Sequence, residues 1–230
     1  MPIAIITGGS RGLGRALATR LVDQGWKLVI DGRGAGQLDQ AAAELGSGVV
    51  AVRGDVADES HRRELVAAAQ ALGGLDALVL NASHLGPSPQ PALAEDPLED
   101  LERVYQVNVF APVRLVQLAL PLLGASRPGG RIVSVTSDAA VEAYEGWGGY
   151  GSSKAALEQL TRVLAVEHPS LRVYVVDPGD MNTQMHQEAF PGEDISDRPP
   201  PETSVPGLID ILEGDLPSGR YQARDLGQGR

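Results

Sequence analysis

The chain has 230 residues, which is enough for one α/β domain with a substantial core and short for two. Its formal net charge of −11 argues against nucleic acids and anionic membranes as general partners, because both would repel an acidic surface. The sequence contains no cysteine, which excludes disulfides, thiol nucleophiles and thiolate metal sites and fits a cytoplasmic location.

An apolar segment begins at the third residue, so we expect no secretory signal peptide. The most apolar stretch, at 104–123, contains Asn108, Pro112 and Arg114. These interruptions favour a buried helix over a membrane span.

Short apolar segments alternate with helical patterns along most of the chain. This alternation predicts a Rossmann-like doubly wound parallel β-sheet with helices on both faces, folded as a single domain over 1–230. We expect strands at 2–7, 27–31, 48–53, 75–80, 131–136 and 171–177. We expect helices at 12–24, 35–45, 58–72, 97–123 and 150–167, with a last helix at 204–213 and a last strand at 219–223.

The first predicted strand ends in the glycine-rich turn Thr7-Gly-Gly-Ser-Arg-Gly-Leu-Gly14. Such a turn lets the backbone approach a pyrophosphate, and the following helix presents free N–H groups to the anion. The spacing of Gly8, Gly12 and Gly14 differs from the Gly-x-Gly-x-x-Gly fingerprint. The turn therefore indicates a dinucleotide site, although a glycine turn can also serve close packing only.

Polar residues follow the ends of the predicted strands. A doubly wound sheet binds its ligand outside the C-terminal ends of its strands, so these residues should converge on one crevice. They are Thr7, Arg33, Asp55, Asn81, Ser137 and Pro178.

Tyr150 and Lys154 are four residues apart on a predicted helix, so their side chains lie on one face. The ordinary pKa of tyrosine is about 10, and a neighbouring ammonium can lower it by roughly 2 to 3 units in a site that excludes water. We therefore expect Lys154 to lower the pKa of Tyr150 and make the phenol a proton donor. An amphipathic helix with an exposed lysine has the same spacing, so the pair alone leaves both interpretations open.

Taken together, the motifs resemble the short-chain dehydrogenase/reductase family of classical type, in order over roughly the first 185 residues. The matching motifs are 7–14, Asp55-Val56, Asn81-Ala82, Asn108, Ser137, Tyr150-x-x-x-Lys154 and Pro178-Gly179. Thirteen residues separate Ser137 from Tyr150, as in the family.

The resemblance implies four catalytic residues. Tyr150 exchanges a proton with the substrate oxygen, and Ser137 polarises the substrate carbonyl. Lys154 tunes the phenol and holds the nicotinamide ribose, while Asn108 bends its helix and holds a water that connects Lys154 to solvent. Ser134 and Thr136 are alternatives to Ser137, and a plain structural hydrogen bond is the alternative for Asn108.

The resemblance also implies a nicotinamide cofactor. Gly32 stands where relatives carry the acid that binds a ribose diol, and Arg33 and Arg11 can clamp a 2′-phosphate, so NADP(H) is favoured. NAD(H) would be preferred if Asp31, one place earlier, reached the ribose, and both arginines could instead be solvated surface charges. The expected cofactor-binding residues are Thr7, Gly8, Ser10, Arg11, Gly12, Leu13, Gly14, Arg33, Asp55, Val56, Asn81, Ala82, Tyr150, Lys154, Pro178, Gly179, Met181 and Thr183.

Within this set, Asp55 should accept a hydrogen bond from the adenine amino group, with a capping role as the alternative. Asn81 should support its strand and the cofactor ribose. The sequence departs from the common Asn-Asn-Ala-Gly of relatives at Leu80 and Ser83. His84 is more typical of an exposed or structural loop histidine than of a catalytic one.

We therefore expect an NADP(H)-dependent oxidoreductase that interconverts a small-molecule carbonyl, a ketone or aldehyde, and its alcohol. Trp147 is a candidate wall for an apolar ring, or a core residue, and nearby acidic residues disfavour a strongly anionic substrate. The alternatives are an NADP-binding redox-sensing regulator without turnover, and epimerase or dehydratase chemistry.

The C-terminal quarter is the least regular part of the sequence. Few strand or helix signals occur at 180–202, which we interpret as a substrate lid, with a loosely packed connection as the alternative. The segment 203–230 is shortened and lacks the glycine-rich ending of many relatives. The helices at 97–123 and 150–167 are consistent with a homodimer or homotetramer, although burial within a monomer would give the same pattern.

Overall fold

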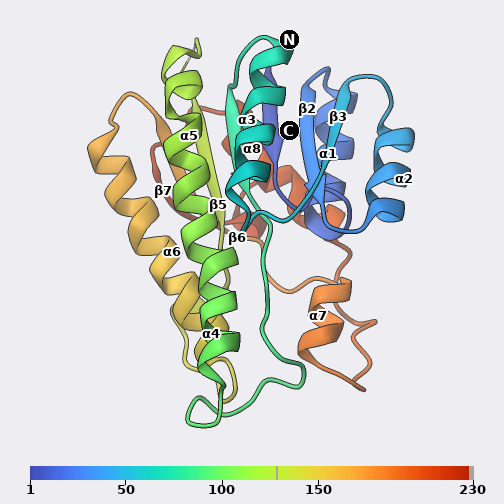
Figure 1. The fold of residues 1–230 in the computed structure, drawn as a ribbon, viewed down its shortest axis with the longest axis vertical. Coiled ribbons are helices and arrows are strands. Elements are labelled where there is room, and N and C mark those ends of the chain that lie inside the picture. Colours follow the sequence, from blue (N-terminus) through green and yellow to red (C-terminus); the bar gives the residue numbers. More distant parts are fainter. Residues whose placement is uncertain (128, 228–230) are drawn as a thin grey trace.

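In the part of the chain that the structure describes, residues 1–127 and 129–227, seven parallel strands form one sheet (Figure 1). The structure is a computed structural model. The strand order is β3-β2-β1-β4-β5-β6-β7, so the winding direction reverses between β1 and β4. This confirms the predicted doubly wound sheet and places a crevice at the reversal. The strands are β1 (Ile3–Ile6), β2 (Lys27–Gly32), β3 (Val49–Arg53), β4 (Ala77–Leu80), β5 (Arg131–Val135), β6 (Arg172–Asp177) and β7 (Gly219–Gln222).

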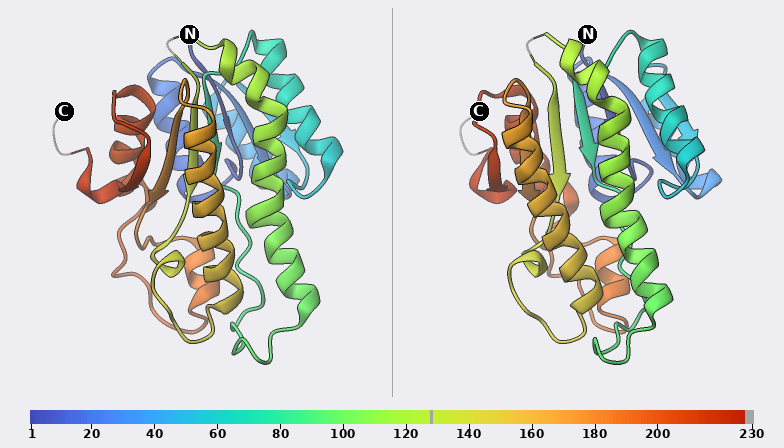
Figure 2. Two further views of the ribbon diagram at one scale, coloured as in Figure 1. Left: turned by 90° about the vertical axis from the view of Figure 1, so that its left-hand side faces the viewer. Right: turned by 60° about the vertical axis from the view of Figure 1, so that its left-hand side comes forward.

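Helices cover both faces of the sheet, as the alternation predicts (Figure 2). The helices are α1 (Gly12–Asp23), α2 (Ala35–Leu45), α3 (Glu59–Leu72), α4 (Leu98–Tyr105), α5 (Ala111–Ala125), α6 (Gly148–Glu167), α7 (Gln184–Ala189) and α8 (Val205–Glu213). Buried leucines of α1, α2 and α8 pack in one core cluster, and those of α3 and α5 pack in another. Since both faces of the sheet are covered, the central strands β1 and β4 are apolar and buried along their whole length rather than alternating.

The helix expected at 97–123 is divided by a π-helical turn, Gln106–Phe110, between α4 and α5. By length and composition, Leu98–Ala125 could cross a membrane, but half of its most apolar window is buried inside the fold. Helix α5 packs against α3 and β4, as a core helix does. The π-helical turn places Asn108 in the protein interior, where it connects two other segments.

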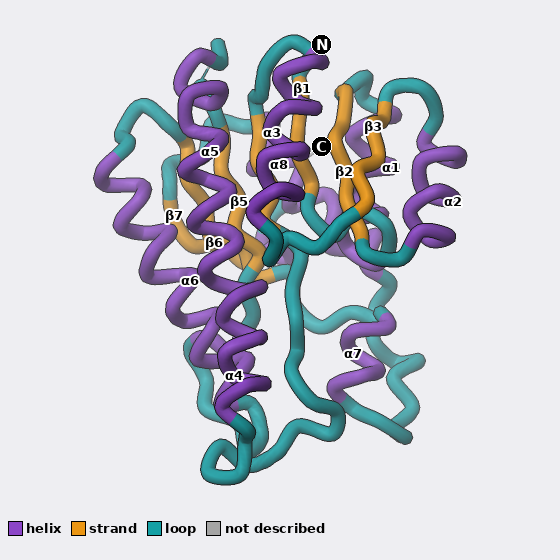
Figure 3. Tube along the Cα trace, in the orientation of Figure 1, coloured by secondary structure: helices purple, strands orange, loops and turns teal. Residues whose placement is uncertain are grey.

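The segment 180–202, where the sequence carries few strand or helix signals, contains the short helix α7. Thr183 caps this helix, because its side-chain oxygen accepts a hydrogen bond from the backbone N–H of His186 at 3.3 Å. Figure 3 shows α7 among the loops at the C-terminal ends of the strands. Helix α6 begins at Gly148, two residues earlier than expected. The last three residues of the predicted C-terminal segment, 228–230, lie outside the described residues.

Candidate active site

A cavity of about 880 Å³ opens at the C-terminal ends of the strands. Its walls come from the segments that follow β1 to β6 and from α7. Of the expected site residues, those that line it are Gly8, Ser10, Arg11, Gly12, Leu13, Arg33, Asp55, Val56, Asn81, Ala82, Ser137, Tyr150, Lys154, Pro178, Gly179, Met181 and Thr183. Thr7, Gly14 and Asn108 do not line the cavity and lie behind its wall.

The glycine turn is closely packed at Gly14 and is followed by backbone N–H groups that have no side-chain cap. Gly8 and Gly12 have φ values of 67° and 55°, a left-handed conformation that only glycine adopts easily. A Cβ on Gly14 would lie 2.4 Å from the carbonyl oxygen of Gly8, so Gly14 serves packing within the turn. Helix α1 starts here without a side-chain cap, and its first N–H groups therefore remain available to an anion.

Thr7 supports the turn from behind the cavity wall, and its expected role in cofactor binding stays a prediction. Its hydroxyl oxygen accepts hydrogen bonds from the backbone N–H groups of Asn81 and Ala82, both at 3.0 Å. The side-chain amide of Asn81 donates to the Thr7 carbonyl oxygen at 2.8 Å. These bonds fix the segment after β4 against the glycine turn.

Asp31 belongs to the lining of the cavity, but its carboxylate is bonded to other groups of the protein. Its carboxylate is 2% exposed, accepts a hydrogen bond from the Gly8 N–H at 2.6 Å, and lies 2.8 Å from Nε2 of His61. At the next position, a Cβ on Gly32 would lie 2.7 Å from Oγ of Ser10. Neither position therefore offers a carboxylate to a ribose diol. His61 was not anticipated, although its position four residues before the buried Leu65 on α3 indicates an inward side chain.

The carboxylate of Asp55 already has protein partners. It accepts a hydrogen bond from the Ala57 N–H at 2.9 Å and pairs with Arg103. Burial raises the pKa of Asp55, but these two bonds and the positive charges of Arg103 and Arg33 together lower it overall. Nearby, burial lowers the pKa of His84, and the positive charges of Arg33 and Arg103 lower it further. Arg33 therefore faces the cavity within a cluster of other charges.

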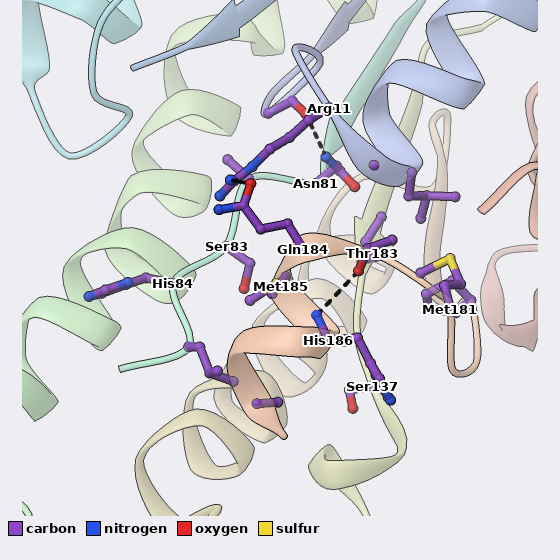
Figure 4. Close-up of a pocket in the computed structure, with 18 of the residues that line it drawn as sticks. Arg11, Asn81, Ser83, His84, Ser137, Met181, Thr183, Gln184, Met185 and His186 are labelled. Atoms are coloured by element: carbon purple, nitrogen blue, oxygen red, sulfur yellow. Dashed lines mark hydrogen bonds between the residues drawn. The ribbon is translucent and has the colours of Figure 1, made fainter. Parts of the chain in front are cut away.

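Arg11 of the glycine turn reaches across to α7. Its guanidinium donates a hydrogen bond to Oε1 of Gln184, the first residue of that helix. Figure 4 shows the two side chains lying against one another at the edge of the cavity. The segment 180–202 is thereby connected to the glycine turn.

Tyr150 and Lys154 are both buried on α6, with exposed fractions of 9% and 2%. The Lys154 ammonium donates a hydrogen bond to the carbonyl oxygen of Val135 at 2.9 Å and lies 5.5 Å from the centre of the Tyr150 ring. Burial raises the pKa of Tyr150 to about 12, although a hydrogen bond with Ser83 lowers it in part. Burial lowers the pKa of Lys154 to about 8.

The expectation that Lys154 lowers the pKa of Tyr150 is thus wrong for the protein alone. Two effects explain the difference. Burial disfavours both the phenolate and the ammonium, and the ammonium bonds to a backbone carbonyl rather than to the phenol oxygen. Tyr150 is consequently held in its protonated form at neutral pH.

Ser137 lines the cavity, whereas the hydroxyls of its two alternatives, Ser134 and Thr136, are hydrogen-bonded to side chains of α6. Ser137 donates to Oδ1 of Asp138 at 2.8 Å and accepts from the Ala139 N–H at 3.2 Å. The hydroxyl of Ser134 lies 2.9 Å from that of Thr161. The hydroxyl of Thr136 donates to Glu158 at 2.9 Å. Ser137 is therefore the strand-end hydroxyl that can turn toward a substrate.

Asn108 connects the segment after β4 to α6. Its side-chain N–H groups donate to the His84 carbonyl oxygen at 2.9 Å and to Oγ of Ser153 at 3.0 Å. Its side-chain oxygen accepts from the His84 N–H at 2.8 Å and from Ser83 at 3.2 Å. The amide thus has protein partners on both sides, and its expected role in a water relay stays a prediction.

An aromatic wall forms the side of the cavity opposite the glycine turn. The ring centre of Trp147 lies 5.7 Å from that of Tyr150, 6.3 Å from Tyr144 and 5.8 Å from Phe190. Met185 of α7 packs against the same group. Trp147 is therefore a wall of the cavity and packs against other aromatic residues at the same time.

An ionic network with two buried carboxylates, those of Glu158 and Asp177, lies beside α6. Arg220 of β7 bonds to Glu158 at 3.1 Å and to Asp177 at 3.4 Å. Asp177 also accepts a hydrogen bond from the Gly179 N–H at 3.0 Å. The network joins α6, the end of β6 with the loop after it, and β7, and no periodic pattern in the sequence indicates it.

Comparison with known proteins identifies similar sequences and similar folds. A family model described as short chain dehydrogenase matches residues 2–194. Benzil reductase ((S)-benzoin forming) of Saccharomyces cerevisiae is 37% identical over 194 residues, which cover 81% of this chain and 74% of that protein. A short chain dehydrogenase from Shigella flexneri 2a, solved with NADP, has a TM-score of 0.89 and 29% identity over 97% of both chains. One from Escherichia coli CFT073, solved with NADPH, has a TM-score of 0.88 and 30% identity over 97% of this chain and 96% of that chain.

Proposed function

The chain belongs to the short-chain dehydrogenase family, and from this premise we propose that it is an NADP(H)-dependent reductase of neutral, aromatic ketones or diketones. As a member of that family it is an oxidoreductase that uses a nicotinamide cofactor and a small-molecule substrate. The cofactor preference, the proton donor and the substrate class are the proposed parts.

The residues around the cavity fit a dinucleotide with a 2′-phosphate. The uncapped start of α1 and the left-handed glycines suit a pyrophosphate. Asp31 is bonded to Gly8 and His61, and Gly32 packs on Ser10, so the usual diol acceptor is missing from both positions. Arg33 and Arg11 line the same end of the cavity and can bond to a phosphate. This combination is the observation that favours NADP(H) over NAD(H).

The protein's own residues supply the proton chemistry. When bound, the reduced nicotinamide supplies the hydride. Tyr150, held protonated by burial, gives its proton to the carbonyl oxygen of the substrate. Ser137 turns its hydroxyl from Asp138 to the same oxygen and stabilises the developing negative charge. Lys154 places a buried positive charge near the phenolate that forms, which favours the product of the proton transfer.

The aromatic wall supports an apolar, ring-containing substrate. Among the described residues that line the cavity, the arginines are Arg11 and Arg33 at the glycine-turn end, and the lysine is Lys154. The acidic side chains of Asp138 and Asp180 also line it. An anionic substrate would therefore find little charge compensation beside Trp147, and aromatic rings can pack on the wall. The yeast relative is a benzil reductase, and benzil belongs to this substrate class.

Two further features belong to the proposal. We propose that 180–202 covers the site as a lid, because Gln184 contacts Arg11 and Phe190 contacts Trp147.

We also propose a cytoplasmic homodimer, formed through exposed apolar side chains at Leu98, Phe110, Leu160 and Val163. Light scattering after size-exclusion chromatography tests the dimer, and a monomer at micromolar concentration would contradict it.

The test of the function is to follow NADPH and NADH absorbance against a panel of substrates. The panel contains an aryl diketone, an aliphatic diketone, an aldehyde, a quinone and a 3-oxoacyl thioester. We expect preferred use of NADPH and of the aryl diketone, with turnover abolished and NADPH binding retained in Tyr150→Phe. Preferred use of NADH or of the anionic thioester would contradict the proposal. NADPH binding without consumption of any substrate would instead support the redox-sensing regulator.

A further inference from the structure

Asp31 is the acidic residue of β2, and His61 of α3 holds its carboxylate in place. Asp31 belongs to the lining of the cavity and is 2% exposed. Its Oδ2 atom lies 2.8 Å from Nε2 of His61, and its Oδ1 atom accepts a hydrogen bond from the Gly8 N–H at 2.6 Å. Both oxygens of the carboxylate are therefore bonded to the protein, although they lie beside the end of the cavity where the adenosine half of the cofactor is expected.

His61 makes this contact through one ring nitrogen. A carboxylate only accepts hydrogen bonds, so Nε2 of His61 carries the hydrogen and donates it to Asp31. The other ring nitrogen, Nδ1, is buried and has no hydrogen-bond partner within the described chain. A Cβ on Gly54, the residue after β3, would lie 2.2 Å from Nδ1, so the glycine leaves the room that the ring needs. The imidazole is thus fixed by packing, and its hydrogen bond is directed at Asp31.

The contact decides what β2 can offer to a nucleotide. A carboxylate at the end of the second strand binds the hydroxyls of the adenosine ribose, and its charge repels a 2′-phosphate at the same place. Gly32 has no side chain for this purpose, and its packing on Ser10 leaves no room for one. Asp31 is therefore the group of β2 that could bind the ribose, and its bond to His61 prevents it from doing so.

We propose that His61 is a positioning residue that sets cofactor specificity: by binding Asp31 it withholds this carboxylate from the adenosine ribose and so favours NADP(H) over NAD(H). This inference rests on the proposed function. Without the imidazole, Oδ2 of Asp31 would be buried without a hydrogen-bond partner, which is unfavourable, and the adjoining cavity offers it one. There the carboxylate would bind a ribose hydroxyl and repel a 2′-phosphate, while Arg33 and Arg11 keep their places.

The affinities for NADPH and NADH, measured by fluorescence titration of each reduced nucleotide, test this role without any substrate. In His61→Leu we expect the ratio of the two affinities to move toward NADH by about tenfold, as for a hydrogen bond to a charged group. The change stays short of a full conversion, because Gly8 still holds one oxygen of Asp31. His61→Gln places an amide donor at about the reach of Nε2 and should keep the natural ratio. An unchanged ratio in H61L would overturn the proposal.

A double variant separates the effect of the carboxylate from that of the imidazole. Asp31→Asn combined with H61L removes the released negative charge, so the movement toward NADH should disappear. A movement that persists in the double variant would refute the role of Asp31. Leu65→Val, at a buried position one turn further along α3, is the control for a loosened helix. It should leave the ratio unchanged, because a change in packing alone affects both nucleotides alike.

Two remaining outcomes also give an answer. If circular dichroism shows that H61L does not fold, His61→Asn replaces it, since its shorter amide cannot reach Asp31. The same movement toward NADH is then expected, and its absence would overturn the proposal. If the natural protein binds NADH more tightly than NADPH, the cofactor preference under the proposed function fails. A further tenfold movement in H61L that is absent in H61Q would still support the role of His61.

Discussion

Lys154 should make the protein less stable at neutral pH than it would be without a charge at that position. Its ammonium is 2% exposed, and burial lowers its pKa from the ordinary 10.5 to about 8. This difference corresponds to about 3 kcal/mol of folding free energy at pH 7. Lys154→Met fills the same space without a charge but leaves the Val135 carbonyl oxygen unpaired, which costs about 1 to 2 kcal/mol. We therefore expect K154M to be about 1 to 2 kcal/mol more stable than the natural protein at pH 7, and inactive.

The pH dependence separates this effect from general changes in packing. Between pH 8 and 10.5 the folded protein has released the Lys154 proton and the unfolded chain still holds it, so stability of the natural protein rises with pH in this window. The advantage of K154M should therefore shrink by about 2 kcal/mol between pH 7 and pH 9.5. Urea unfolding followed by tryptophan fluorescence measures the free energy of unfolding of the natural protein and of K154M at each pH. Tyrosine ionisation is common to the two proteins, so it does not change the difference between them. A destabilised K154M, or an advantage that does not change with pH, would refute the reasoning.

Three other substitutions test separate parts of the site. Arg33→Ala should raise the KM for NADPH roughly 10- to 100-fold and leave the KM for NADH unchanged, since it removes a charge-assisted bond to the 2′-phosphate. Steady-state kinetics measures both constants, and an unchanged KM for NADPH would show that Arg33 does not bind the phosphate. Trp147→Ala should lower kcat/KM for an aryl diketone about tenfold more than for an aliphatic one; equal losses would indicate a packing role only. Arg220→Met should lower stability in urea by about 1 to 3 kcal/mol, because Glu158 and Asp177 lose their bonds to Arg220 while Glu158 keeps those to Arg162 and Thr136. An unaltered unfolding midpoint would contradict the importance of the network.

The fold could be predicted because its signals are local. Apolar strands and amphipathic helices alternate along the sequence, and the glycine turn marks the first crossover. Of the residues expected at the strand ends, Arg33, Asp55, Asn81, Ser137 and Pro178 line one cavity, because parallel strands finish at the same edge of the sheet, whereas Thr7 lies behind its wall. Helix α7 was missed because its six residues are too few to show a helical period.

The side-chain pairings could not be predicted in the same way. His61 meets Asp31, and Arg220 meets Glu158, across separations of 30 and 62 residues, and no spacing in the sequence records such contacts. The direction of the Tyr150 pKa was also misjudged. The spacing to Lys154 indicates a shared helix face, but only the structure shows that the ammonium points to a backbone carbonyl.

The packing of Gly32 against Ser10 has a practical consequence for anyone wishing to redesign coenzyme choice. Introducing an aspartate at position 32 would drive its first side-chain carbon into the serine hydroxyl of the neighbouring turn, since only 2.7 Å separate the two atoms. A single exchange should thus disturb the nucleotide turn before it can attract a ribose. Conversion to an NADH enzyme would require paired changes, with a glycine at position 10 accompanying the new acid.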